Sequence, residues 1–325
     1  MVADPEKISI TAKLSAYYRQ FSDIAFASEV AALIGAEAAY SKLARDYGLD
    51  RDQLTAYAPM FEARYKSVSE LIRKSGASQI LELACGYSMR GLELTRSGTL
   101  RYVETDLQGV ISTKQELLDE VRRCHHIAPS SRHHVTVADA LDVEQLRVAV
   151  RELDARQPLL VLCEGLMGYL TRAETERVAT NIRALLGDHG GGSWIVPDFT
   201  FVSELRNLPP ERLRLRSAVR GITQRQLDAS AFEDQDDLVS FFADLGFDTR
   251  VSSQIDETPS FASLASLGLP VSLLDRLRPV LRVWVMTPAP SAGTSSWTGA
   301  SLHQTKDAPV SINRLKKSRS SPPLP

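Results

Sequence analysis

The sequence predicts an α/β fold with one mostly parallel sheet of seven strands, helices in front of it and a helical cap. From residue 79 onward, short apolar runs alternate with stretches of helical character. This alternation is typical of parallel strands that are buried on both faces and joined by helices. Before residue 79, apolar side chains recur at helical spacing instead. The chain has 325 residues, of which 43% are hydrophobic and 24% charged, so one large domain with additions is expected.

The elements follow from these patterns in chain order. Residues 10–74 are rich in Ala, Leu, Glu and Lys, and their periodicity predicts about three helices. Apolar runs predict strands at 80–83, 100–103, 135–138, 159–163, 194–196, 247–251 and 280–286. Helices are expected between them at 112–123, 172–186 and 234–245. Thr171 and Glu174 form a capping-box pattern at the start of the second of these helices.

Two segments fall outside the alternation. Residues 199–232 contain a Pro-Pro break and an Arg-rich helical piece at 211–220, and we expect them to form a lid over a substrate. The tail at 288–325 is rich in Ser, Pro, Thr and Lys and lacks apolar periodicity, so we expect it to be disordered. The chain is thereby divided into an N-terminal helical cap (1–78), a core (79–287) that carries the lid, and the tail.

The bulk composition excludes several classes of partner. The net charge is -2, with 38 basic and 40 acidic residues, so no overall field favours nucleic acid or an anionic membrane. The cysteines, Cys85, Cys124 and Cys163, form no Cys-x-x-Cys pair, which is typical of a reduced, cytosolic chain. The N-terminus lacks a signal-peptide pattern, and no apolar run approaches the ~18 residues of a membrane span. We therefore expect a cytoplasmic protein.

The first predicted strand leads into a loop with a small residue, Ala84, and one glycine, Gly86. A strand, a glycine-bearing loop and a helix turn backbone N–H groups toward a ligand at the carboxyl edge of the sheet. Gly86 reaches dihedral angles that a side chain would resist, and Ala84 leaves space for the ligand. These residues alone predict a nucleotide-binding loop and do not specify the nucleotide. The loop lacks the Gly-x-Gly-x-x-Gly pattern, which disfavours a pyrophosphate and a nicotinamide cofactor.

Acidic residues stand at the ends of the next three strands. Asp106 follows Gly86 by 20 residues, a spacing that suits a carboxylate bound to a ribose diol. Asp139 and the small Ala140 end the third strand and suit the exocyclic amine of adenine. Glu164 places a further carboxylate at the end of the fourth strand. One such acid often only caps the next helix, but suitable groups on four consecutive strands favour a binding site.

Three blocks of the sequence carry a more specific resemblance. They are residues 81–91, residues 102–107 with Lys114 downstream, and residues 164–170. On these blocks the chain resembles the leucine carboxyl methyltransferase family, and within it the bacterial branch of polyketide-type O-methyltransferases. The resemblance spans roughly residues 10 to 287. It implies a class I methyltransferase with a Rossmann-like sheet, and S-adenosylmethionine (SAM) as the cofactor.

The resemblance also implies roles for single residues in binding SAM. Ala84 and Gly86 match the family's loop around the methionine part of SAM. Asp106 matches the ribose-binding acid. Asp139 and Ala140 match the adenine contact.

Four further residues match the family near the methionine end and the acceptor. Glu164 matches the acid near the methionyl amino group, and Arg64 matches the arginine that grips the SAM carboxylate. Lys13 matches an N-terminal lysine that lines the active site, and Tyr169 matches a tyrosine beside the reaction chamber. We therefore expect Lys13 and Tyr169 to contact the substrate.

The expected function is O-methylation of a carboxylate, or of a hydroxyl, on a small molecule such as a secondary metabolite. A carboxylate is already ionised at neutral pH and needs no general base, whereas a phenol with a pKa of about 10 does. No histidine lies in a motif at the ends of the strands, which favours the carboxylate. The sequence identifies no catalytic residue and does not specify the oligomeric state.

Other functions remain open at this stage. The family loop commonly reads Gly-Ala-Gly followed by Asp, whereas Tyr87 and Ser88 follow the glycine here. This departure motivates the alternative of a SAM-binding or dimerising protein without catalysis. A protein C-terminal carboxyl methyltransferase is a further alternative, and a nicotinamide oxidoreductase is disfavoured by the missing glycines.

Two polar clusters have both a functional and an ordinary surface interpretation. His125, His126, His133 and His134 fall at a helix end and in a loop, so polar residues without a metal are the favoured interpretation. An arginine run could attract an acidic acceptor, but a solvated helix face is the favoured interpretation; the run comprises Arg212, Arg214, Arg216 and Arg220.

Overall fold

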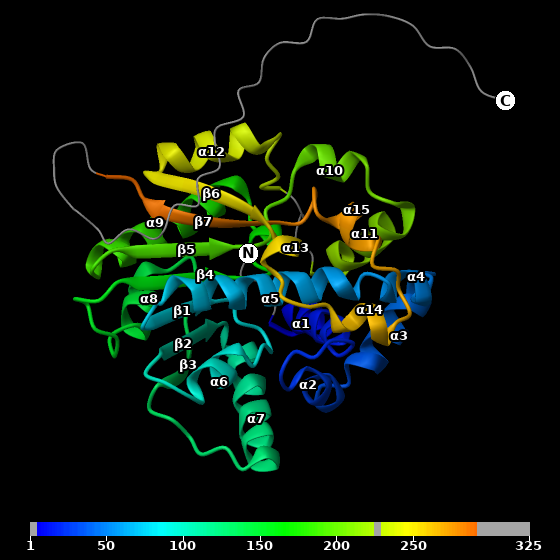
Figure 1. Cartoon of the computed structure of the whole chain (residues 1–325), viewed down its shortest axis with the longest axis horizontal. Helices are drawn as coiled ribbons and strands as arrows, with labels where there is room; N and C mark the ends of the chain where they lie inside the picture. The colour runs from blue at the N-terminus through cyan, green and yellow to red at the C-terminus, as the bar shows by residue number, and fades with distance from the viewer. Residues whose placement is uncertain (1–4, 224–228, 291–325) are drawn as a thin grey trace, which may run out of the picture. The chain divides into compact units, whose positions relative to one another are not determined.

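The computed structural model describes residues 5–223 and 229–290 and contains a seven-stranded sheet (Figure 1). The strand order is β3-β2-β1-β4-β5-β7-β6. β1 to β5 run parallel, and β7 is antiparallel to both β5 and β6, which confirms the predicted fold class. The strands are β1 (Gln79–Leu83), β2 (Arg101–Asp106), β3 (His133–Val137), β4 (Leu159–Cys163), β5 (Gly192–Val196), β6 (Phe247–Ser253) and β7 (Arg282–Pro288).

Helices cover both faces of the sheet. Successive strand residues point to opposite faces, and the helices bury both sets of side chains. Ile80 packs with side chains of α5, whereas Leu81 packs with side chains of α8 and α9. The first face is covered by α5 (Ala58–Ser75), α6 (Arg90–Thr95) and α7 (Gln108–His125). The second face is covered by α8 (Val143–Ala149), α9 (Arg172–Asp188) and α12 (Gln235–Asp244).

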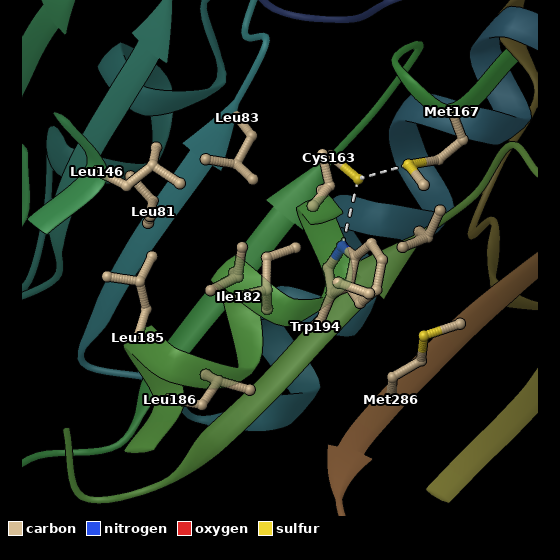
Figure 2. Close-up of a cluster of buried hydrophobic side chains, with 14 of the residues drawn as sticks. Leu81, Leu83, Leu146, Cys163, Met167, Ile182, Leu185, Leu186, Trp194 and Met286 are labelled. Atoms are coloured by element: carbon tan, nitrogen blue, oxygen red, sulfur yellow. Dashed lines mark hydrogen bonds between the residues drawn. The ribbon is translucent and has the colours of Figure 1, made fainter. Parts of the chain in front are cut away.

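The core between the sheet and α9 reaches the end of β4, next to Glu164. Figure 2 shows Cys163 and Trp194 pointing toward each other from β4 and β5. The indole Nε1 of Trp194 donates a hydrogen bond of 3.2 Å to the Cys163 Sγ, whose thiol faces the Met167 Sδ at 3.8 Å. The buried indole N–H therefore has a partner, and the end of β4 is fixed one residue before Glu164.

The segment before the sheet forms five helices within residues 5–78 rather than about three. They are α1 (Pro5–Arg19), α2 (Ala27–Leu33), α3 (Ala36–Asp46), α4 (Arg51–Thr55) and α5. Gly35, where φ is 63°, separates α2 from α3. Asp50 caps the start of α4, and its side chain accepts a 3.0 Å hydrogen bond from the Gln53 N–H. These turn and cap residues divide what periodicity alone would join.

Further helices lie beyond the carboxyl ends of the parallel strands (Figure 1). α10 (Val202–Arg206) and α11 (Pro210–Thr223) belong to the insertion at 199–232 that was expected to form a lid. Its two ends pair, because the Phe232 N–H donates to the Thr200 oxygen at 2.9 Å and the Val202 N–H to the Phe232 oxygen at 2.8 Å. α13 (Gln254–Glu257), α14 (Ala262–Ser266) and α15 (Leu273–Leu277) connect β6 to β7.

The described residues up to Ala289 form one compact unit. The tail expected to be disordered, residues 288–325, lies outside the described residues from position 291 on. No helix among residues 5–223 and 229–290 is long and apolar enough to cross a membrane.

Candidate functional site

The loop after β1 adopts a backbone conformation that ordinary residues avoid. Ala84 and Gly86 have φ angles of 51° and 52°. A left-handed conformation is strained for an alanine and is concentrated at binding sites. In this conformation the Gly86 N–H donates a 2.8 Å hydrogen bond to Oδ2 of Asp106. The first two strand ends are thereby joined at the residues that the sequence singled out.

Asp106 is held by two backbone donors. Besides Gly86, the Leu107 N–H donates to Oδ1 of Asp106 at 2.8 Å. Burial raises the pKa of Asp106, and these two hydrogen bonds oppose that effect. A carboxylate has about four lone-pair sites, so Asp106 keeps acceptor capacity for two hydroxyls of a ligand.

Asp139 and Ala140 follow β3 and are also held in place. The Leu141 N–H donates to Oδ1 of Asp139 at 2.9 Å. The carbonyl oxygen of Ala140 accepts a 3.0 Å hydrogen bond from Nδ2 of Asn181 on α9. Because β3 runs parallel to β2, both residues lie at the same edge of the sheet as Asp106.

Glu164 is surrounded by three arginines from different parts of the chain. The Arg64 Nε donates to Oε1 of Glu164 at 3.0 Å, and Arg19 contacts the same oxygen. The Arg90 Nη2 donates to Oε2 at 2.6 Å. Burial opposes ionisation, but the three guanidinium groups hold the pKa of Glu164 well below its usual range.

Arg90 stabilises the interior of the protein and is not available to a ligand. Its side chain is fully buried, and its Nη1 donates to Oε1 of Glu82 at 2.9 Å. Its guanidinium also lies 4.0 Å from the ring centroid of Tyr65. Three arginines thus contact two buried carboxylates directly. The Nε of Arg19 has no hydrogen-bond partner in the part of the chain that the structure describes.

A cavity of about 1310 Å³ opens at this edge of the sheet and continues under the cap helices. The predicted site residues that line it are Arg64, Ala84, Gly86, Asp106, Asp139, Ala140, Glu164 and Tyr169. The structure therefore brings together eight of the nine residues named from the sequence. Tyr169 enters from the short helix η1 (Met167–Tyr169), and burial raises the pKa of its phenol.

Lys13 is the predicted site residue that does not line the cavity. It lies on α1 between two residues that do, Ala12 and Leu14. The lining positions on α1 recur with helical periodicity, and Arg19 belongs to that face whereas Lys13 does not. Arg19 is therefore a basic side chain that α1 contributes to the site.

Asp198 is a site residue that the sequence reasoning missed. It follows β5, lines the cavity, and its Oδ2 accepts a 2.9 Å hydrogen bond from the Gly165 N–H. Its Oδ1 is buried without a hydrogen-bond partner among the described residues. Burial, and to a lesser degree the charge of Glu164, raise the pKa of Asp198 to about 6. The signal was present, because Asp198 ends a strand as Asp106 and Glu164 do.

Of the histidine-rich segment, His133 lies in the interior of the fold. The Nε2 of His133 lies 2.7 Å from Oε2 of Glu104, and the Lys114 Nζ donates to Oε1 of Glu104 at 2.8 Å. A Cβ on Gly91 would lie 2.7 Å from the His133 Nε2 and 2.8 Å from the Glu104 Cδ. Gly91, the last glycine of the block at 81–91, is therefore required for packing. His125 instead pairs with Glu29 near the surface, at 2.6 Å.

The arginine run of α11 divides into two faces. Arg214 and Arg220 are exposed, as expected for a solvated helix face. Arg212 and Arg216 instead line the cavity. The interpretation of the run as a solvated face was therefore wrong for these two residues, because the periodicity of α11 directs them under the cap.

The strand order and the acids at the ends of β2, β3 and β4 define the fold of a class I SAM-dependent methyltransferase. The solved structure of a candidate methyltransferase from Thermobifida fusca shares this fold, with a TM-score of 0.52. The two proteins are 16% identical, and the match covers 85% of this chain and 94% of the other.

Proteins similar in sequence are named for S-adenosyl-L-methionine. The S-adenosyl-L-methionine-dependent methyltransferase dpfgK of Gibberella zeae is 34% identical over 122 residues, which are 37% of this chain and 38% of that protein. Candidate S-adenosyl-L-methionine-dependent methyltransferases of Mycobacterium bovis and Mycobacterium tuberculosis are 28% identical over 227 residues, 67% of this chain and of each relative. The sequence model for leucine carboxyl methyltransferase matches residues 23–183. Over that stretch the chain is similar to the leucine carboxyl methyltransferase family.

Proposed function

We propose that the chain transfers the methyl group of SAM to an oxygen of a small molecule, and that this oxygen belongs to a carboxylate. The observation that supports the proposal is the continuity of one cavity. It is lined by Asp106 and Asp139 at the strand ends and by Arg212 and Arg216 under the cap. A donor held at the strand ends would face an acceptor held under the cap, away from water. Alignment of the two reactants is most of what methyl transfer requires.

The residues at the edge of the sheet fit the parts of SAM. Asp106 has acceptor capacity for the ribose hydroxyls, and Asp139 lies at the neighbouring strand end, where it suits the adenine amine. Glu164 suits the ammonium of the methionine part, and the guanidinium groups of Arg64 and Arg19 suit its carboxylate. SAM supplies a methyl group that its sulfonium charge already activates.

The cap side of the cavity fits an organic acid. Most of its lining there is apolar or aromatic, including Tyr57, Met60, Leu208, Leu215 and Val219. A carboxylate acceptor is ionised at neutral pH, so the chain has to orient it and need not deprotonate it. The apolar walls would hold the body of the acid and exclude water from the reacting oxygen.

Hydroxyl methylation is a second candidate function, and Asp198 favours it. Oδ1 of Asp198 has no protein partner among the described residues, and the pKa of about 6 leaves the carboxylate ionised at neutral pH. Such a group could take the proton of a hydroxyl acceptor. With a hydroxyl acceptor, we expect Asp198→Asn to lower kcat by about 10²–10⁴-fold, and the wild-type rate to rise with pH through about 6. With a carboxylate acceptor, neither effect is expected.

Calorimetric titration with SAM tests the donor site. We expect Asp106→Ala to weaken SAM binding at least about tenfold, because a hydrogen bond to a charged group contributes about 1.5–3 kcal/mol. Asp142→Asn is the matched control: Asp142 caps α8 away from the cavity lining, and asparagine also caps helices. Unchanged affinity in Asp106→Ala, or no binding to the wild type, would contradict the proposal.

Release of S-adenosylhomocysteine tests the acceptor side. The protein is incubated with SAM and a panel of organic acids, matched alcohols, and peptides with free carboxyl ends. We expect release with acids and formation of their methyl esters. Release only with the peptides would support a protein carboxyl methyltransferase instead. SAM binding without any release would support a non-catalytic protein.

A further inference from the structure

Arg212 and Arg216 lie one helical turn apart on α11 and both line the cap side of the cavity. Arg214, between them in sequence, is exposed. The helix therefore presents two guanidinium groups to the cavity and turns a third away from it. This separation provides a matched comparison within one element.

Arg212 lacks a carboxylate partner within salt-bridge distance in the described part of the chain. Its Nη1 lies 3.1 Å from the Met60 Sδ, and its guanidinium lies 4.8 Å from the ring centroid of Tyr57. Neither group neutralises a positive charge. Burial lowers the pKa of Arg212, and the charge of the nearby Arg64 lowers it further. Removal of an ion from water without an opposite charge is costly, so this position favours an anion from elsewhere.

Arg19 and Arg64 differ in this respect, because both contact Glu164. Arg216 lies close enough to Arg212 for the two charges to repel. Burial and that repulsion lower the pKa of Arg216 to about 10, which still leaves it positive at neutral pH. Two positive charges thus act on the same part of the cavity.

The surroundings of the two arginines include groups suited to one end of an amphipathic ligand. The Tyr18 hydroxyl, which also lines the cavity, is buried without a hydrogen-bond partner among the described residues. Leu215 and Val219 line the cavity from the same helix. Met60, which contacts Arg212, lies one turn before Arg64 on α5, so this pocket adjoins the arginine assigned to the donor.

We propose that Arg212 and Arg216 form an anion site that binds the carboxylate of the acceptor, an organic acid with an apolar or aromatic body. The assignment of this acid as the acceptor rests on the proposed function. The guanidinium pair fixes the charged end by charge-assisted hydrogen bonds, and the apolar cap residues hold the body. The site is distinct from the donor's carboxylate site, which Arg64 and Arg19 form with Glu164.

Calorimetry with acid and amide pairs tests the proposal without requiring the true acceptor. The probes are benzoate, 4-phenylbutyrate and decanoate, each compared with its neutral amide. We expect at least one acid to bind the wild type about tenfold more tightly than its amide, because only the acid carries the charge. In Arg212→Gln that preference falls about tenfold, Arg212→Lys keeps part of it, and Arg214→Gln keeps all of it.

SAM binding, measured on the same variants, separates this proposal from the proposed function. We expect Arg212→Gln to bind SAM as the wild type does. A loss of SAM affinity in Arg212→Gln would assign this arginine to the donor and overturn the proposal. Equal binding of every acid and its amide, or an unchanged preference in Arg212→Gln, would also overturn it. Failure of the wild type to bind SAM would contradict the proposed function alone, since acid binding is measured without SAM.

Discussion

Glu164 divides its two carboxylate oxygens between arginines of different kinds. Arg90 holds Oε2 and is also fixed by Glu82, whereas Arg64 and Arg19 share Oε1 near the cavity. A ligand carboxylate would therefore recruit the second pair and leave Arg90 in place. Removal of Arg90 would leave Glu82 buried without a guanidinium partner and Oε2 of Glu164 without its donor, which affects the fold before it affects binding.

Arg64→Gln is therefore expected to weaken binding of SAM at least about tenfold, because a charge-assisted contact to its carboxylate is lost. The same change should leave 5′-methylthioadenosine binding unaltered, since that compound lacks the amino-acid part. Calorimetry with both ligands measures the two effects. Arg73→Gln is the control on the same helix, with a side chain that is 70% exposed. Equal losses for both ligands would show that Arg64 does not contact the amino-acid part.

Single residues were predictable from the sequence where a strand end positions them. Asp106, Asp139 and Glu164 follow apolar runs, so their place at the sheet edge follows from the alternation. Arg90 and Arg19 could not be found in this way, because charged residues are ordinarily exposed and no local pattern reveals a buried ion pair. Their partner, Glu164, is distant in sequence and comes near only through the fold.

At the scale of elements, α9 begins at a capping box that the sequence predicted and the structure confirms. The Thr171 Oγ1 accepts a 3.2 Å hydrogen bond from the Glu174 N–H, and Oε2 of Glu174 accepts one of 2.8 Å from the Thr171 N–H. Since α9 starts directly after the segment that carries Glu164 and Tyr169, its first turn also anchors one wall of the cavity.

Thr171→Ala is expected to lower the free energy of unfolding by about 1 kcal/mol, because an N-terminal N–H of α9 loses its acceptor. Urea denaturation monitored by circular dichroism measures this change. Thr171→Ser keeps the hydroxyl and should restore most of the stability. Equal losses in the two variants would mean that the methyl group of Thr171, rather than its cap, supports the helix.

The elements were predictable in proportion to how strongly burial marks them. β4 was predicted with its observed bounds, because every one of its residues is buried. The N-terminal helices were under-counted, because their breaks depend on single turn residues such as Gly35 and on caps such as Asp50. The cap was expected as an insertion, but which arginines of α11 face the cavity depends on how that helix packs.

At the scale of the whole molecule, acid stability depends on carboxylates buried under α6 and α7. Glu104 is fully buried between Lys114 and His133. Burial acts against ionisation, but Lys114 and His133 outweigh it and hold the pKa of Glu104 at about 2, below its usual 4.5. Glu82 titrates in the opposite sense, because burial raises its pKa. A variant is therefore needed to isolate the contribution of Glu104.

Because the folded-state pKa of Glu104 is depressed, its contribution is fully present above about pH 4.5 and is lost as the pH falls toward about 2. Glu104→Gln should lower the free energy of unfolding by about 3–5 kcal/mol at pH 7, since it leaves Lys114 buried without a counter-charge. Urea denaturation between pH 7 and 3 should show this difference from the wild type shrinking below about pH 4.5. Glu144→Gln, at an exposed pair with Arg147, should cost less than about 1 kcal/mol. Glu104→Gln combined with Lys114→Met should recover part of the loss, because no unpaired charge remains. A difference that stays constant from pH 7 to 3 would contradict the assignment of an ionised Glu104.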